Sequence, residues 1–157
     1  MKRPVPLSLL AAAAVTLALV AAGPAPSAST TPSARAAKLA LSPSAWGKIL
    51  VDGRGRTLYL FEKDTRGRSA CGSACATYWP PLLTGAKTTA GRGVKAALLG
   101  VTRRSDGSTQ VTYAGHPLYS FAQDSRPGQV TGENSHAFGA DWYVVSAAGK
   151  KVEKRIH

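Results

Sequence analysis

The two cysteines of the chain, Cys71 and Cys75, are the residues best suited to redox or metal chemistry. Three residues separate them, and Gly72 gives this short segment backbone freedom. In an exported chain, an even number of cysteines predicts a structural disulfide. Two alternatives are a redox-active disulfide and a copper site in which both thiolates and His116 bind the metal. If the disulfide is structural, we expect no cofactor, and we expect the bridge to shape the turn leading to Trp79.

Tyrosine and aspartate recur in a motif, Leu-Tyr-x-Phe-x-x-Asp, that occurs twice with a spacing of sixty residues. The motif residues are Tyr59, Phe61 and Asp64 in the first copy, and Tyr119, Phe121 and Asp124 in the second. Residues two apart in a strand share a face, so Tyr and Phe are predicted to pack in the core. Each Asp is predicted to accept N–H groups of its own loop. The alternative is a cation site or hydrolase with both carboxylates in one cleft.

A tryptophan follows each copy of the motif, Trp79 in the first and Trp142 in the second. Repetition with shared context predicts two similar halves, repeat 1 at 47–83 and repeat 2 at 98–146. Burial is the expected state of both indole rings. Aromatic residues exposed in a cleft beside basic residues would instead favour a glycan or cell-wall polymer as ligand.

The sequence contains no motif of a known enzyme class. Gly-x-Ser-x-Gly, His-Glu-x-x-His and a phosphate-binding glycine loop are all absent from it. We therefore assign no catalytic residue and favour a non-enzymatic binding or structural module.

The N-terminus has the features of an export signal. Lys2 and Arg3 precede an apolar stretch and then small residues, which predicts a signal peptide over 1–22 with cleavage somewhere in 22–36. No cysteine precedes Cys71, so lipidation at the cleavage site is not expected. Residues 23–44 are mainly Ala, Ser, Thr and Pro, which predicts a disordered linker before a single β-domain at 45–156. The protein is therefore expected to be secreted or associated with the cell envelope.

The chain is strongly basic, with a net charge of +12. This charge favours contact with an anionic envelope polymer or an acidic envelope protein. The basic residues are scattered and accompany no recognition helix, so nucleic acid is not an expected partner. Arg103 and Arg104 are interpreted as part of this solvated basic surface.

Glycine and proline interrupt the chain every few residues, and β-branched and aromatic residues lie between them. This pattern predicts about seven short strands and little helix. Strands are expected at 46–52, 57–62, 98–104 and 109–114, the last two joined by an Asp-Gly hairpin, and a helical turn at 73–78. The expected architecture is a small antiparallel β-sandwich or partly open barrel built from two pseudo-symmetric repeats.

Taken together, these motifs resemble the bacterial "secreted repeat of unknown function" family, whose members carry a Tyr-x-(Phe/Trp/Tyr)-x-x-Asp motif, also written Y-X4-D. The resemblance rests on the paired motifs, the Cys71/Cys75 segment before Trp79-Pro80-Pro81-Leu82, the Arg104–Gly107 hairpin and the closing Trp142. It implies an envelope or extracellular location and no particular reaction. Many relatives look lipidated, and this chain departs from them because it lacks the required cysteine.

Overall fold

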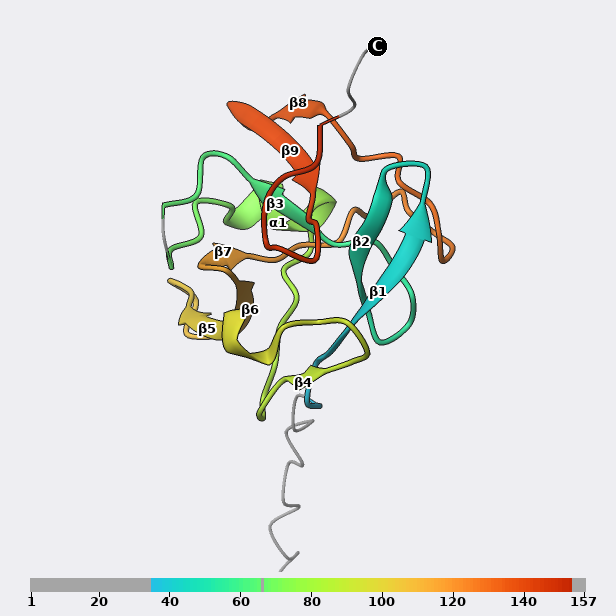
Figure 1. The fold of residues 1–157 in the computed structure, drawn as a ribbon. Helices are drawn as coiled ribbons and strands as arrows, with labels where there is room; N and C mark the ends of the chain where they lie inside the picture. Colours follow the sequence, from blue (N-terminus) through green and yellow to red (C-terminus); the bar gives the residue numbers. More distant parts are fainter. Residues whose placement is uncertain (1–34, 66, 154–157) are drawn as a thin grey trace, which may run out of the picture. The chain divides into compact units, whose positions relative to one another are not determined.

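A computed structural model describes residues 35–65 and 67–153 (Figure 1). The predicted signal peptide at 1–22, and the predicted linker before residue 35, lie outside the described residues. Within the described part of the chain, no helix is both long enough and apolar enough to cross a membrane.

The described residues are mostly β-structure, as predicted, in three small sheets. The first sheet contains β1 (Lys38–Ser44), β2 (Gly47–Asp52) and β4 (Thr89–Ala90). The second contains β3 (Tyr59–Phe61), β8 (Ser135–Ala137) and β9 (Ala140–Val144). The third contains β5 (Leu99–Arg103), β6 (Thr109–Tyr113) and β7 (His116–Pro117). The helical elements are α1 (Ser73–Tyr78) and a 3-10 turn (Ala96–Leu98). The all-β class is confirmed, and the sheets do not close into a barrel.

The predicted boundary between linker and domain at residue 45 is wrong. Strand β1 begins at Lys38 and pairs along its length with β2. Leu39 is 0% exposed and belongs to the hydrophobic core. Its burial and the backbone pairing offset the weak strand propensity of the surrounding Ala, Ser and Pro residues.

The two repeats begin in the same way. Each starts with an antiparallel hairpin, β1–β2 in the first and β5–β6 in the second. Each hairpin is followed by a tight turn in which a glycine, Gly55 or Gly115, has a positive φ. The motif segment follows this turn in both cases, so the internal repeat of the sequence is also a structural repeat.

The two motif segments pair with each other. Tyr59 donates its N–H to the carbonyl of Tyr119 at 2.8 Å, and Tyr119 donates back to Tyr59 at 3.0 Å. This antiparallel bridge joins the repeats at equivalent residues. The repeats are therefore related by a pseudo-twofold axis that passes between the two tyrosines.

The segment around each tryptophan also pairs across the repeats. β9, which contains Trp142, lies antiparallel to β3 of repeat 1 (Figure 1). In the other half, residues 80–82 pair with the second motif segment through Leu82 N–H to Leu118 and Ser120 N–H to Pro80. Each repeat thus supplies a segment that pairs with the motif segment of the other.

Candidate functional site

The motif tyrosines and aspartates form hydrogen bonds between the repeats. The hydroxyl of Tyr59 donates to Asp124 Oδ2 at 2.6 Å, and the hydroxyl of Tyr119 donates to Asp64 Oδ2 at 2.8 Å. Each Tyr therefore binds the Asp of the other copy, not the Asp of its own. We call these two contacts the cross-repeat hydrogen bonds.

Each aspartate also closes its own loop, as the sequence predicted. Asp64 Oδ1 accepts the N–H of Ala70, and Asp124 Oδ1 accepts the N–H and hydroxyl of Thr131. Each carboxylate thus holds the far end of its own loop and the tyrosine of the other repeat.

The structure does not bring the two carboxylates to one groove. Asp124 is 3% exposed, and one of its carboxylate oxygens accepts the hydroxyl of Tyr59 from the other repeat. Asp64 lines a groove with Glu62, His116 and Lys151, and Asp124 is not part of that groove. The arrangement gives no support to a two-carboxylate hydrolase site.

The aromatic motif residues form a stack that alternates between the repeats. Its four members, in order, are Phe61, Trp142, Trp79 and Phe121. The two indole rings lie 3.9 Å apart and inclined by 4°. Tyr59 contacts Trp79 edge-on, and Tyr119 contacts Trp142 in the same way. The predicted burial of both tryptophans is therefore observed, and half-buried Phe121 closes one end of the stack.

A glycine makes room for this stack. A side-chain carbon at Gly132 would lie 2.6 Å from the Trp79 ring and 3.1 Å from Phe121. The same residue donates its N–H to the hydroxyl of Tyr59. Close approach of the backbone to the indole ring therefore requires glycine at this position.

Cys71 and Cys75 form a disulfide, as predicted. Both residues are buried, and the bridge joins Cys71, two residues before α1, to Cys75 within that helix. Trp79 donates its N–H to the carbonyl of Cys75 at 2.8 Å. The bridged residue Cys75 therefore also holds the backbone of Trp79, the residue that enters the stack.

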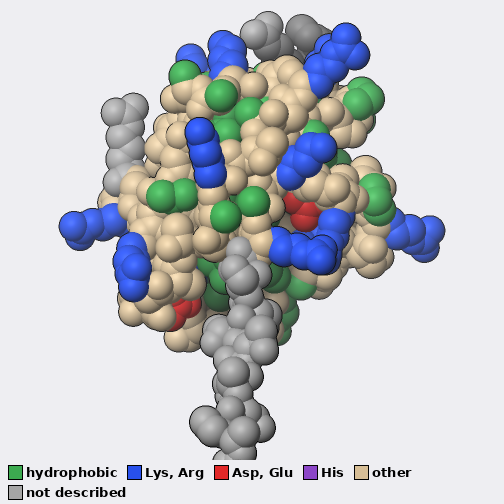
Figure 2. All heavy atoms as spheres, turned by 90° about the horizontal axis from the view of Figure 1, so that it is seen from below, with side chains coloured by type: hydrophobic (Ala, Val, Ile, Leu, Met, Phe, Trp, Pro, Cys, Tyr) green, Lys and Arg blue, Asp and Glu red, His purple; other side chains and the backbone are tan. Residues whose placement is uncertain are grey.

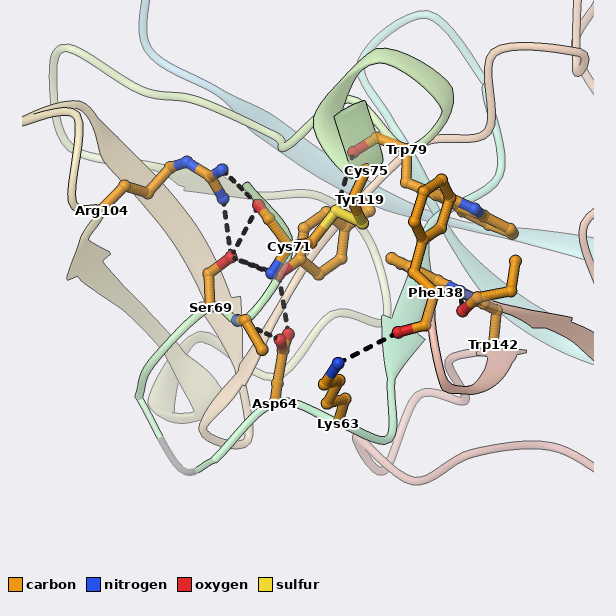
Figure 3. Close-up of a disulfide and its surroundings, with 12 residues drawn as sticks. Lys63, Asp64, Ser69, Cys71, Cys75, Trp79, Arg104, Tyr119, Phe138 and Trp142 are labelled. Carbon is orange, nitrogen blue, oxygen red and sulfur yellow. Dashed lines mark hydrogen bonds between the residues drawn. A yellow bond between two sulfur atoms is a disulfide. The ribbon is translucent and has the colours of Figure 1, made fainter. Parts of the chain in front are cut away.

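Arg104 was interpreted as part of a solvated basic surface, and that interpretation is wrong. The residue is 8% exposed. Its guanidinium donates to the side chain of Ser69 and to the carbonyl of Cys71 (Figure 3). It also donates to the side chain of Gln110. The Ser69 hydroxyl in turn lies 2.7 Å from the hydroxyl of Tyr119. Arg104 therefore connects the disulfide loop to one of the cross-repeat hydrogen bonds.

The copper alternative gains no support from the geometry. The sulfur atoms of Cys71 and Cys75 are bonded to each other, so this oxidation state offers no thiolate ligand. His116 lines the groove beside Asp64, which contains neither cysteine. Among the described residues, no group of three or more His, Cys, Asp or Glu side chains is arranged to hold a metal ion.

Residues 43–83 and 100–146 match the family described as "Secreted repeat of unknown function". These stretches correspond to the two structural repeats and cover more than half of the chain. The chain belongs to this family. No match was found among curated proteins or among solved structures. Membership in the secreted-repeat family indicates an extracellular location and identifies no reaction.

Two carboxyl groups of this secreted repeat have raised pKa values. Burial raises the pKa of Asp64 to about 6, although the hydrogen bonds from Ala70 and Tyr119 and the charge of Arg104 act in the opposite direction. Burial also raises the pKa of Glu133 to about 7, against the N–H of Val144 and with the help of Glu153. Both groups therefore take up protons more readily in the folded chain than in the unfolded chain.

We expect the free energy of unfolding to increase as the pH is lowered from 8 to 5. The folded pKa values of Asp64 and Glu133 exceed their unfolded values, so their contribution is complete in acid and is lost as the pH rises through 6 and 7. The total gain should be about 1–2 kcal/mol, because both groups are partly screened by solvent. Urea unfolding at several pH values measures it.

The matched control for this pH dependence is Glu133→Gln, which keeps the size of the side chain and removes its titration. The free energy of unfolding of this variant should change less between pH 8 and pH 6 than that of the parent protein. A stability that falls steadily over this range on acidification, equally in both proteins, would contradict the assignment.

Proposed function

We propose that this secreted repeat is a non-enzymatic binding module whose ligand is an anionic polymer of the cell envelope. The observation that carries the proposal is that the acidic side chains of the domain are paired internally and most of its basic side chains are not. Acidic side chains are engaged by internal partners, whereas most of the described basic side chains are free of ion pairs. The surface presented to solvent is therefore predominantly cationic.

The acidic side chains show this most clearly. All eight of them lie in the described part of the chain, and each has an internal partner. The pairs are Asp52–Arg56, Glu62–Lys151, Asp64–Tyr119, Asp106–Arg104, Asp124–Tyr59, Glu133–Val144 (N–H), Asp141–His136 and Glu153–Lys151. An approaching polyanion thus meets few unpaired carboxylates.

The basic side chains are arranged differently. Only Arg56, Arg104 and Lys151 form ion pairs with carboxylates among the described Lys and Arg residues. Figure 2 shows Lys and Arg side chains spread over one face of the molecule, where Asp and Glu reach the surface at few points. A spread of this kind suits a long, flexible polyanion better than a compact ligand.

One group of these cations lies around the start of β1. Lys38 pairs in register with Thr89, two residues after Lys87. A side chain at Gly53, next to Arg54, would touch Lys38. Gly91, next to Arg92, donates its N–H to Leu39. We call Lys38, Arg54, Lys87 and Arg92 the β1 basic group, and all four are exposed.

Binding to polyglutamate tests the proposal, because this polymer supplies negative charge without other recognition features. We expect binding at low salt that weakens steeply as the salt concentration rises. Changing the β1 basic group to glutamine should lower the affinity by about tenfold or more, since four charges are lost. The readout is the dissociation constant by fluorescence titration.

The matched control replaces each lysine of the group by arginine and each arginine by lysine, which preserves the charge at every site. This control should bind polyglutamate as the parent protein does. An affinity that does not change with the salt concentration, or that is equally high in the glutamine variant, would overturn the proposal.

Export by a signal peptide at 1–22, without lipidation, is part of the same proposal. The basic pair, the apolar stretch and the small residues that follow support it, as does the lack of any cysteine before Cys71. N-terminal sequencing of the protein recovered outside the cytoplasm would locate the cleavage.

A further inference from the structure

Two aromatic side chains stay on the surface of a domain that buries most of its aromatic residues. Tyr78 is 53% exposed and Phe138 is 39% exposed. Their ring centroids lie 5.9 Å apart, and their planes are inclined by 41°. The two rings therefore form one continuous aromatic surface, which we call the Tyr78–Phe138 pair.

Each ring is held by a rigid part of the fold. Tyr78 is the last residue of α1, and the Cys71–Cys75 disulfide fixes the start of that helix. Phe138 lies in the turn between β8 and β9, next to Ala137, whose carbonyl accepts the ring N–H of Trp142 (Figure 3). A preorganised surface of this kind loses little entropy when a ligand binds.

The backbone at Phe138 is in an unfavourable conformation. Phe138 and Gly139 have φ values of 59° and 89° and form the two-residue loop of the β8–β9 hairpin. Such loops favour Asn-Gly or Asp-Gly, because a bulky side chain is disfavoured at positive φ. The chain therefore holds a large aromatic ring where asparagine would suit the fold better. Strain of this kind is often retained at functional sites.

A cation accompanies the pair. Lys63 Nζ donates to the carbonyl of Phe138 at 3.2 Å, and the lysine side chain is exposed (Figure 3). Aromatic faces attract weakly positive C–H groups such as those on one face of a sugar ring, and an ammonium group attracts a carboxylate. An acidic sugar offers both features in one residue.

We propose that the Tyr78–Phe138 pair stacks on a sugar ring of an anionic glycan, with Lys63 binding the acidic group. This proposal rests on the proposed function and narrows the polyanion to a polysaccharide. A ligand without sugar rings would use the basic surface alone. A glycan would also stack on the Tyr78–Phe138 pair, and salt weakens such stacking far less than it weakens binding to the basic surface.

The test compares two probes in the purified protein: a hyaluronan decasaccharide, which carries sugar rings and carboxylates, and polyglutamate, which carries carboxylates alone. We expect Phe138→Asn to weaken hyaluronan binding about tenfold, the loss of one aromatic contact. Its polyglutamate binding should be unchanged, and its thermal unfolding temperature unchanged or higher. Tyr78→Ser should give the same pattern of binding and serves as the second variant.

The outcomes separate the two proposals. Hyaluronan binding that is equal in the parent protein and both variants, or absent while polyglutamate binds, overturns the glycan site and leaves the electrostatic module standing. Failure of both probes at low salt overturns both proposals. A lower unfolding temperature in Phe138→Asn together with unchanged hyaluronan binding would show that the ring serves the fold, and would also overturn the glycan site.

Discussion

Replacing Trp142 by alanine is expected to lower the free energy of unfolding by about 3–5 kcal/mol. Trp142 is fully buried and lies between Phe61 at 4.0 Å and Trp79 at 3.9 Å, with its ring nitrogen donating to the carbonyl of Ala137. The substitution leaves a cavity where the two repeats meet and removes contacts to both. Because domains of this size are stable by about 5–15 kcal/mol, urea unfolding should show a large shift in midpoint.

Tyr78→Ala is the matched control for this variant, since it also removes a large aromatic ring from the same region. Tyr78 lies on the surface, so the loss should stay below about 1 kcal/mol. A loss at Trp142 as small as that of the control would mean that the stack does not hold the repeats together.

The second large effect is expected at Asp124. Changing it to alanine removes the acceptor of Tyr59 and of two donors of Thr131, and leaves the hydroxyl of the buried Tyr59 without its acceptor. We expect a loss of about 2–3 kcal/mol, the usual contribution of hydrogen bonds to a charged group. Urea unfolding measures it. Glu153→Ala is the control, because this carboxylate is exposed and forms only a surface ion pair; an equal loss in the two variants would contradict a structural role for Asp124.

Local patterns in the sequence were sufficient for much of the fold. The alternation around Tyr59 predicted a buried strand, and the Asp106-Gly107 pair predicted the β5–β6 hairpin. Cys71 and Cys75 were predicted to form the bridge that shapes the approach to Trp79. These features depend on residues close together in the chain, which is why sequence reasoning reached them.

The contacts that join the repeats had no local signature. Tyr119 and Asp64 are 55 residues apart, and each motif looked complete when its own Tyr, Phe and Asp were considered together. The pairing of equivalent residues across a pseudo-twofold axis appears only when both copies are folded against each other. The motif is therefore half of a unit, and two copies are needed to satisfy its polar groups.

Two further features were hidden for a different reason. Leu39 lies in a stretch whose Ala, Ser and Pro content resembles a linker, and its pairing with Asp52 in β2 and Ala90 in β4 makes it part of a sheet. Arg104 looks like a surface cation, since its buried partners Ser69 and Gln110 are uncharged. In both cases the tertiary contacts decided the structure against what composition alone indicates.

The cross-repeat hydrogen bonds give the Tyr-x-Phe-x-x-Asp motif a physical role that does not require catalysis. They bind the two copies at their equivalent strands and leave the outer surface available for a ligand. The Tyr78–Phe138 pair and the exposed cations lie outside this network, so the parts that hold the domain together differ from the parts proposed to bind.

A double-mutant cycle tests this role most directly. The cycle combines Tyr59→Phe with Asp124→Asn and, for comparison, Tyr59→Phe with Asp64→Asn, with unfolding free energies measured in urea. We predict a coupling energy of about 1 kcal/mol or more for Tyr59 with Asp124, and less than about 0.5 kcal/mol for Tyr59 with Asp64. Coupling that is larger within the first copy than between the copies would contradict the account.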